Sequence, residues 1–298
     1  MGSIDRRVFA GQIPFTGVLG REGLFTVEQI APDAPQSLLH KRVVVDAVIS
    51  CNTCDLCRGG LSHLCEARTV PGAYRADGYA APVVCAPIRS LIAVPRLIPD
   101  DIAVFAQSIA AAMHITNTAL RDARGFITVL GDGLMALLVA QLAAAQYPNV
   151  RLLGKHPDRF TRCERWGIKH RHIVEAGKRN DQSVVIDCTG DASNSGFPTA
   201  VSLVRPRGKI FIKAPPFPIA AANETATGHA VAMAQAASQE VAVIGAGAGH
   251  IRDAISALSS RRVDVAGLVA RSYPLGRAVE ALQSLHDRSV IGCELSLA

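Results

Sequence analysis

The sequence of 298 residues predicts an α/β protein, with a β-rich amino-terminal part followed by a doubly wound parallel sheet. Three observations predict this fold class. Short apolar segments broken by prolines fill the chain up to about residue 99. From residue 126 onwards, strand-like and helix-like segments alternate, which is typical of a parallel sheet covered by helices. A glycine-rich turn joins the first strand of that series to its first helix.

The amino-terminal part, residues 1–99, is expected to contain short strands rather than long helices. KRVVVDAVIS at 41–50 is an apolar run rich in valine, and the turn signal Asp77-Gly78 precedes YAAPVVCAP, which we expect to be extended. Prolines in the stretch up to Pro99 exclude long helices, because proline cannot donate the helical hydrogen bond. Residues 100–120 then begin with acids and are rich in helix-forming residues, so a helix is expected there.

The second part of the chain follows a regular alternation. Strands are expected at 126–131, 150–154, 184–190, 209–213 and 240–246, and helices at 134–146, 157–167 and 193–204. Two further helical segments, 251–260 and 275–285, and a terminal strand at 290–297 complete the chain. Strand–helix alternation of this kind predicts a parallel sheet with helices on both faces.

Composition excludes several classes of function. Hydrophobic residues make up 49% and charged residues 19%, which is typical of a globular chain. Aromatic residues are only 5%, so nucleic acid bases would find few stacking platforms. The longest apolar stretch, 134–145, is too short to span a bilayer, and the amino terminus has no apolar signal core. We expect a cytoplasmic protein whose partners include neither nucleic acid nor membrane.

The charge pattern leaves one stretch open to two interpretations. The net charge is +6, with no long run of Lys and Arg. The densest basic stretch runs from Lys155 to His172 and is interrupted by acids. It fits either a solvated helix face or a site for an anionic ligand.

Four of the eight cysteines are crowded into one short segment. They follow the pattern C-x2-C-x2-C-x7-C and are Cys51, Cys54, Cys57 and Cys65. Four thiolates can hold a zinc ion tetrahedrally, and because they leave no position for substrate, the ion would be structural. We expect one such zinc per chain. Disulfides or an iron–sulfur cluster are the alternatives, and the expected cytoplasmic location disfavours disulfides.

A dinucleotide-binding turn is the second strong signal. VLGDGLMA contains the G-x-G-x-x-A pattern between a strand and a helix, which is the context that the pattern requires. Gly131 would make the tight turn, Gly133 would let the pyrophosphate approach the helix amino terminus, and Ala136 would let the helix pack closely. The expected cofactor contacts run along Gly131, Asp132, Gly133 and Leu134. The alternative is that this segment is only a turn.

The residues after the second strand bear on the choice between NAD and NADP. An acid at this position usually accepts hydrogen bonds from the ribose hydroxyls. The chain instead has Gly154-Lys155-His156, with Arg159 one helical turn later. Lys155 and Arg159 could pair with a 2′-phosphate, so NADP is favoured over NAD. The alternative for Lys155 is an ordinary exposed lysine at a strand end.

These motifs together resemble the zinc-containing medium-chain alcohol dehydrogenases, including threonine and polyol dehydrogenase relatives. The matching stretches are KRVVVDAVISCNTCDLCRGGLSHLC, VLGDG, VVIDCTG, SLVRPRGKIFIK and EVAVIGAGAG. The resemblance implies a GroES-like domain over 1–99, truncated at its start and carrying a zinc lobe at 51–65. It further implies a Rossmann domain over 100–250 and a return of 251–298 to the first domain. A small-molecule substrate and a homodimer or homotetramer are also implied.

The chain departs from the family at the catalytic zinc. No cysteine precedes Cys51, whereas members with a catalytic zinc have a ligand there in a stretch like G-x-C-G/N-T-D. Gly20-Arg21-Glu22 stands where the family has Gly-His-Glu, and Gln107 stands where Glu or Cys is common. The resemblance therefore implies that the catalytic zinc is lost. His63 and His114 are expected to form ordinary hydrogen bonds rather than replace the ligands.

Two functions follow from this comparison. The first is an NAD(P)-dependent oxidoreductase without catalytic zinc, in which Arg21, Glu22 and Gln107 are the candidate catalytic residues. The alternative is a non-catalytic dinucleotide-binding protein that acts as a sensor or partner subunit. A third reading, in which the recorded start is too late, does not explain Arg21 and Gln107.

Overall fold

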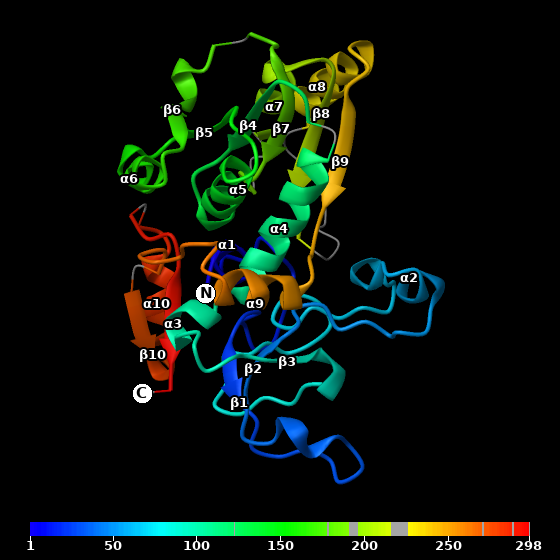
Figure 1. Ribbon diagram of the computed structural model, residues 1–298, viewed down its shortest axis with the longest axis vertical. Helices are drawn as coiled ribbons and strands as arrows, with labels where there is room; N and C mark the ends of the chain where they lie inside the picture. Colours follow the sequence, from blue (N-terminus) through cyan, green and yellow to red (C-terminus); the bar gives the residue numbers. More distant parts are fainter. Residues whose placement is uncertain are drawn as a thin grey trace. The chain divides into compact units, whose positions relative to one another are not determined.

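The computed structural model describes residues 1–121, 123–177, 179–190, 196–215, 226–269, 271–287 and 289–297. The chain divides into two compact units (Figure 1). Among the described residues, the first unit contains those of 1–110 and 248–297, and the second contains those of 111–215 and 226–247. The sequence-based boundaries at residues 99 and 250 stay predictions.

The first unit contains a small antiparallel sheet in the order β1-β2-β3. The strands are β1 (Leu24–Thr26), β2 (Arg42–Val45) and β3 (Leu91–Ala93). β2 lies within the valine-rich run and buries Val43, Val44 and Val45, but it is shorter than that run. Just after the strand, the Asp46 carboxylate accepts the backbone N–H of Val48 at 3.0 Å, and this local bond turns the chain out of the sheet.

The segment 79–87, which was expected to be extended, forms no strand. Pro82 and Pro87 cannot donate a ladder hydrogen bond, which restricts pairing at both positions. Tyr79 is nevertheless buried, and its ring meets Phe25 edge-on with the centroids 5.7 Å apart. Backbone hydrogen bonds hold the start of the segment, since the N–H groups of Tyr79 and Ala80 donate to the carbonyl oxygens of Gly20 and Leu19 at 2.9 Å.

The helices of this unit are short. They are α1 (Ser3–Phe9), α2 (Asp55–Arg58), α3 (Asp100–Ala103), α9 (Ile251–Ser259) and α10 (Ala278–Ser284), with 3₁₀ turns at Gln36–Leu38, Ser62–Leu64, Ile88–Ser90 and Leu275–Arg277. β10 (Arg271–Pro274) and β11 (Cys293–Ser296) pair in parallel. The helix expected over 100–120 is divided into α3 and α4 (Ala106–Leu120). No described helix is long and apolar enough to cross a membrane.

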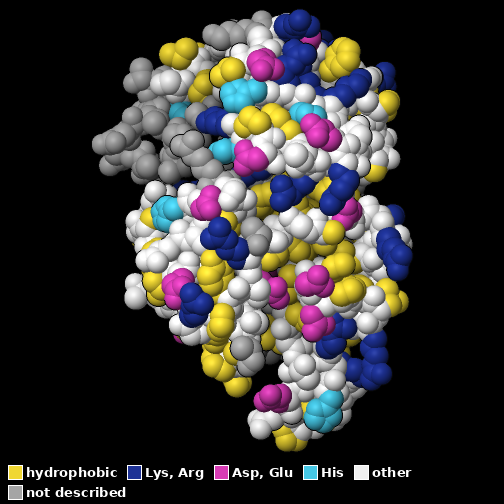
Figure 2. Space-filling view, turned by 90° about the vertical axis from the view of Figure 1, so that its left-hand side faces the viewer, with side chains coloured by type: hydrophobic (Ala, Val, Ile, Leu, Met, Phe, Trp, Pro, Cys, Tyr) yellow, Lys and Arg dark blue, Asp and Glu magenta, His cyan; other side chains and the backbone are white. Residues whose placement is uncertain are grey.

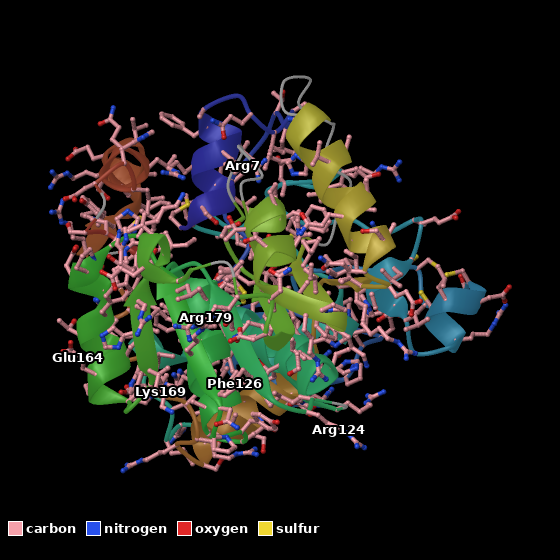
Figure 3. All side chains as sticks on the ribbon, turned by 90° about the horizontal axis from the view of Figure 1, so that it is seen from above. Arg7, Arg124, Phe126, Glu164, Lys169 and Arg179 are labelled. Carbon is pink, nitrogen blue, oxygen red and sulfur yellow. The ribbon has the colours of Figure 1, made fainter. Side chains whose placement is uncertain are left out.

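The second unit is built on a six-stranded parallel sheet in the order β6-β5-β4-β7-β8-β9. Its strands are β4 (Phe126–Leu130), β5 (Val150–Gly154), β6 (Lys169–His172), β7 (Gln182–Asp187), β8 (Val204–Lys213) and β9 (Ala242–Ala246). In Figure 3, Phe126 marks the start of β4 and Lys169 the start of β6. The order reverses between β4 and β7, and a doubly wound sheet binds its ligand at such a switch point.

Helices cover both faces of this sheet, as the sequence predicted. Residues on one face of β4, β5 and β7 pack with α7 (Gly196–Leu203) and α8 (Ala226–Ser238). The alternate residues Val129, Leu152 and Ile186 face the other side and are fully buried as well. α5 (Leu134–Ala144) packs on β4 and β5, and α6 (Pro157–Arg165) follows β5.

Two elements of this unit were not predicted from the sequence, namely β6 and α8. β6 has the sequence KHRH, which lacks the apolar alternation of a strand. It lies at the edge of the sheet, where charged side chains prevent pairing with another chain. Figure 2 shows Lys and Arg, acidic and His side chains interspersed in its upper part. His170 of β6 lies 3.7 Å from Glu164 of α6, so the stretch 155–172 includes acid–base contacts of its own.

Candidate functional site

The four clustered cysteines form a compact group of thiols. Their Sγ atoms all lie within 4.8 Å of one another. Cys51 Sγ is 3.9 Å from Cys57 Sγ and 3.5 Å from Cys65 Sγ, and Cys54 Sγ is 3.9 Å from Cys65 Sγ. A tetrahedron with zinc–sulfur bonds of about 2.3 Å has edges of about 3.8 Å. The sulfurs are therefore spaced as ligands of a single ion.

The same distances bear on the two alternatives for these cysteines. All eight cysteines of the chain are free, so disulfides are absent. An iron–sulfur cluster would place several irons and sulfides between the thiolates and hold them farther apart. The donor set thus fits one zinc ion.

Neighbouring backbone groups fix the lobe around the thiols. Arg68 donates to the backbone oxygen of Cys65 at 2.8 Å, and Cys54 immediately precedes α2. Arg58 pairs with Asp55 at 2.7 Å on the exposed side of α2. Within the described residues, these four cysteines are the single group of three or more metal-binding side chains close enough to share an ion.

The glycine-rich turn lies at the carboxyl end of β4, beside the switch point. Gly131 has φ +105°, a backbone conformation that side chains rarely adopt. A Cβ atom there would also lie 3.2 Å from the Cys188 carbonyl oxygen of the neighbouring strand end. The turn therefore needs glycine at this position, as the sequence motif predicted.

Gly133 leaves open space at the amino terminus of α5. It precedes the helix directly, and no side chain caps the free N–H groups of the first turn. A Cβ atom at Gly133 would meet nothing within 4 Å. Ala136, one turn on, is fully buried. Open space in front of uncapped N–H groups is what a pyrophosphate requires, so the turn fits a dinucleotide.

Asp132 does not point into this open space. Its carboxylate reaches the end of β5 and accepts the backbone N–H groups of Lys155 at 2.6 Å and His156 at 2.8 Å. It also contacts His156 Nδ1 at 3.0 Å and the Arg159 guanidinium at 3.2 Å. Burial raises the pKa of Asp132, but hydrogen bonds from His156 and Lys155 outweigh it and lower the pKa overall. The Asp132 side chain closes the turn after β5.

This contact corrects one sequence-based expectation. The residues that follow β5 include no acid, yet a carboxylate does lie there, because Asp132 supplies it from the neighbouring turn. Gly154 makes room for it, since a Cβ atom at Gly154 would lie 2.6 Å from Asp132 Oδ2. Arg159 is paired with this carboxylate, while the Lys155 side chain is exposed.

A third group of polar residues lies in the first unit, at positions where the resemblance to the alcohol dehydrogenases leads one to expect catalytic zinc ligands. Ser108 donates its hydroxyl hydrogen to Glu22, with Oγ 2.9 Å from Oε1 and 3.1 Å from Oε2. Gln107 Oε1 accepts the backbone N–H of Ala47 at 3.3 Å. Burial raises the pKa of Glu22, and the charge of Arg21 and the hydrogen bond from Ser108 counteract this in part. Ser108 was missed by the sequence analysis, since only the fold brings it to Glu22.

Arg21 precedes Glu22 in the chain, and its charge lowers the pKa of Glu22, but the described side chains of the two form no salt bridge. The Arg21 Nε–H is buried without an acceptor among the described residues. His63 and His114 each have contacts of their own and belong to no described metal-binding group.

The fold and these sites are similar to those of the medium-chain alcohol dehydrogenases, which combine a GroES-like part with a Rossmann sheet. The family model for the alcohol dehydrogenase GroES-like domain matches residues 2–96. Among curated proteins, L-threonine 3-dehydrogenase of Sinorhizobium medicae is 30% identical over 173 residues. That match covers 56% of this chain and 48% of the relative, so the chain aligns with about half the length of that relative. The starvation-sensing protein RspB of Escherichia coli is 24% identical over 221 residues, covering 70% of this chain and 64% of the relative.

Solved structures show the same fold. A short chain alcohol dehydrogenase (rspB) from Escherichia coli, complexed with NADH, has a TM-score of 0.81 at 20% identity, covering 98% of this chain and 86% of that one. A zinc-binding dehydrogenase from Sinorhizobium meliloti, bound to NADP, has a TM-score of 0.77 at 22% identity, covering 93% and 83%. The NADH and the NADP were observed in those two proteins.

Proposed function

We propose that this chain is an NAD(P)-dependent oxidoreductase that holds one structural zinc ion and no catalytic zinc. The observation that carries the proposal is the open, uncapped amino terminus of α5 beside Gly133, at the switch point of the parallel sheet. A helix amino terminus of this kind favours a pyrophosphate through its free N–H groups and its dipole. The structures of similar fold that contain NADH or NADP also support the proposal that this chain binds a dinucleotide.

In this proposal the pyrophosphate of the cofactor binds along Gly131, Asp132, Gly133 and Leu134. Asp132 would contact the pyrophosphate through its backbone only, because its carboxylate already accepts the backbone N–H groups of Lys155 and His156. The exposed Lys155 would meet the 2′-phosphate of NADP with a charge-assisted hydrogen bond, and Arg159 would add its charge despite its pairing with Asp132. NADP is accordingly preferred over NAD.

Zinc at Cys51, Cys54, Cys57 and Cys65 has a structural role. Four protein ligands fill its coordination sphere and leave no position for a substrate. The ion is proposed to hold the segment between the first and last of these cysteines in one conformation. Few apolar side chains of this segment are buried, so the metal would supply much of its stability.

A catalytic zinc does not fit the polar residues of the first unit. Arg21 is cationic, the Gln107 oxygen already accepts the Ala47 N–H, and Glu22 is held by Ser108. Catalytic zinc sites use three protein ligands, and these residues supply no such set. This supports the proposed loss of the ion and favours reduction of an activated carbonyl or alkene over oxidation of simple alcohols.

The residues of this chain have proposed roles in such a reduction. When bound, the reduced nicotinamide supplies the hydride. Ser108 and Glu22 form a hydrogen-bonded pair that can hold a proton and pass it to the oxygen on which negative charge develops. Gln107 and Arg21 can donate hydrogen bonds to that oxygen or to a neighbouring group of the substrate.

Titration of the purified protein with NADPH and with NADH tests the proposal. The fluorescence of the reduced nicotinamide reports how much of each dinucleotide is bound. Saturable binding of NADPH, weakened when Gly133 is replaced by Val, is expected, because the valine side chain would occupy the open space. If neither dinucleotide binds, the proposed function is wrong. A screen of carbonyl and alkene substrates follows if one of them binds.

A non-catalytic dinucleotide-binding protein is the second candidate. The observation that favours it is that Gln107 and Glu22 are both engaged by groups of the protein itself. Binding without turnover of any substrate in the screen would support a sensor or partner subunit. A homodimer or homotetramer and a cytoplasmic location are further proposals, which size-exclusion chromatography with light scattering and cell fractionation would test.

A further inference from the structure

Three arginines of the second unit lie on neighbouring parts of the parallel sheet. Arg151 is near the start of β5, and Arg171 is on the edge strand β6. Arg179 lies in the connection that leads to β7, where Figure 3 labels it. Arg151 is opposite Lys169 in the ladder between the two strands, and Leu153 is opposite Arg171, so Arg151 and Arg171 share one face of the sheet. We call Arg151, Arg171 and Arg179 the arginine cluster.

The charges of the arginine cluster act on one another. Burial lowers the pKa of Arg151, and the positive charges of Arg171 and Arg179 lower it further, while the carboxylate of Asp181 opposes this. Both arginines are therefore close enough to Arg151 for their repulsion to be felt. Three cations beside the carboxylate of Asp181 leave a surplus of positive charge, which attracts anions.

A buried chain of hydrogen bonds holds the Arg151 guanidinium. Its Nε donates to the Thr128 hydroxyl at 2.9 Å, and that hydroxyl donates to Gln182 Oε1 at 2.6 Å. Gln182 Nε2 in turn donates to the Asp181 carboxylate at 2.5 Å. Thr128 is fully buried and Gln182 is 2% exposed, so water does not compete for the bonds between them. The orientation of Arg151 is thus set before any ligand binds.

The terminal nitrogens of these arginines are left open to solvent. Those of Arg151 form no hydrogen bond or salt bridge with a described residue, and neither nitrogen is buried. The side chains of Arg171 and Arg179 are exposed and likewise form no such bond within the described part of the chain. By contrast, Arg159 of the same unit pairs with Asp132 at 3.2 Å.

A phosphate group fits this arrangement better than a carboxylate does. A guanidinium presents its N–H donors in a planar fork that pairs with two oxygens of an anion. A phosphate monoester carries close to two negative charges at neutral pH and has three oxygens that accept such donors. It can therefore accept hydrogen bonds from more than one arginine, whereas a carboxylate has two oxygens and a single charge.

We propose that the arginine cluster binds the phosphate group of a small molecule, at a site distinct from the proposed cofactor site. Arg151 and Lys169 are at the amino-terminal ends of β5 and β6, whereas Gly131 follows the carboxyl end of β4. The bound phosphate offsets the repulsion within the cluster and therefore stabilises the folded protein. The inference goes beyond the proposed function and does not depend on dinucleotide binding.

Calorimetric titration of the purified protein tests this site. The probes are inorganic phosphate, glycerol 3-phosphate and acetate, with sodium chloride keeping the ionic strength constant. We expect saturable binding of at least one phosphate, about tenfold tighter than that of acetate. Tighter binding of inorganic phosphate would identify the free ion as the ligand, and tighter binding of glycerol 3-phosphate would identify a phosphorylated small molecule. Chemical denaturation should give a higher free energy of unfolding in millimolar phosphate than in chloride of the same ionic strength.

Matched variants locate the effect. Arg171→Gln and Arg179→Gln are each expected to weaken phosphate binding about tenfold, because each removes a charged donor. Neither should lower the free energy of unfolding in phosphate-free buffer, since both side chains are exposed and unpaired among the described residues. Arg252→Gln removes the same charge from an exposed position of α9, in the first unit, and should leave phosphate binding unchanged.

The absence of saturable phosphate binding overturns the inference, and so does binding that Arg171→Gln and Arg179→Gln leave unchanged. Stabilisation that chloride reproduces at the same ionic strength also overturns it, because screening of the repulsion would then explain the effect. Displacement of phosphate by NADPH would place the phosphate in the cofactor site and has the same consequence. If NADPH does not bind at all, the proposed function fails, while the phosphate titrations still decide this inference.

Discussion

Asp132 and His156 are joined by two contacts across the carboxyl edge of the parallel sheet. The Asp132 carboxylate accepts the backbone N–H of His156 at 2.8 Å and lies 3.0 Å from its Nδ1. It does so from the turn that follows β4, whereas His156 belongs to the turn that follows β5. The two turns that flank the proposed pyrophosphate and ribose positions are therefore connected through one side chain, which also pairs with Arg159 at 3.2 Å.

Replacing Asp132 by Asn is expected to increase the preference for NADPH over NADH. The substitution removes the charge that pairs with Arg159, so more of the guanidinium charge would be available to a 2′-phosphate. It should also lower the free energy of unfolding by about 1–3 kcal/mol, because several N–H donors lose an anionic acceptor. Dissociation constants for both dinucleotides and chemical denaturation measure the two effects. An unchanged ratio of affinities in Asp132→Asn would show that Arg159 plays no part in cofactor choice.

Lys155→Asp is expected to reduce the affinity for NADPH about tenfold or more and to narrow or reverse the preference over NADH. The exposed ammonium group would lose its hydrogen bond to the 2′-phosphate, and the new carboxylate would repel it. Lys169→Asp, which makes the same change on the exposed edge strand β6, is the control. If the parent binds both dinucleotides equally, Lys155 is an ordinary surface residue.

Purified protein is expected to contain one zinc ion per chain, and Cys54→Ser to lower both the zinc content and the free energy of unfolding, the latter by several kcal/mol. The ion links four points of the segment 51–65, and a hydroxyl is a poor substitute for a thiolate. Cys85→Ser is the matched control, because Cys85 is exposed and lies outside the group. Metal analysis by mass spectrometry decides between outcomes: no zinc contradicts the structural site, and two zinc ions contradict the loss of the catalytic one.

Glu22 should make stability depend on pH. Burial raises its pKa in the folded protein above the ordinary value of 4.5, so the folded state binds this proton more tightly than the unfolded state. The resulting stabilisation is fully present below pH 4.5 and is lost as the pH rises through the folded pKa. As the pH rises through the folded pKa of Glu22, the free energy of unfolding of Glu22→Gln should therefore fall less than that of the parent. Denaturation at several pH values measures this, with the exposed Glu28→Gln as control, and parallel curves for parent and Glu22→Gln would contradict it.

Zinc-dependent oxidation of simple alcohols is not expected of this chain. A catalytic zinc would help an alcohol lose its proton, but Arg21 and Gln107 stand where ligands would be needed. Any activity should appear as reduction driven by NADPH and should survive a chelator that spares the structural ion. Assays in both directions, with Arg21→His beside the parent, measure this. Robust alcohol oxidation by the parent, abolished by chelation while the fold persists, would contradict the prediction.

Much of the second unit could be predicted from the sequence, because its signals are local. The strands at 126–131 and 150–154 and the helix at 134–146 differ from the structure by at most two residues at an end. Buried parallel strands are continuous apolar runs, and the turn at Gly131 requires a glycine. The four cysteines were likewise recognisable, since one loop carries all the ligands of the ion.

Other features depended on tertiary structure. β6 has no apolar pattern because it lies at a sheet edge, and the segment 79–87 forms no strand but begins with backbone hydrogen bonds to Gly20 and Leu19. The sequence placed no acid after β5, whereas the fold brings Asp132 there from a turn that is distant in the sequence.

The sequence by itself determined the fold class, the group of four thiols and the glycine turn, since each is encoded within one short segment. Only the tertiary structure decided that Ser108 donates to Glu22 and that Asp132 pairs with Arg159. These contacts join side chains from segments that lie far apart in the sequence. Hydrogen bonds and charge interactions depend on the distance between atoms in space, which the spacing of residues along the chain does not reveal.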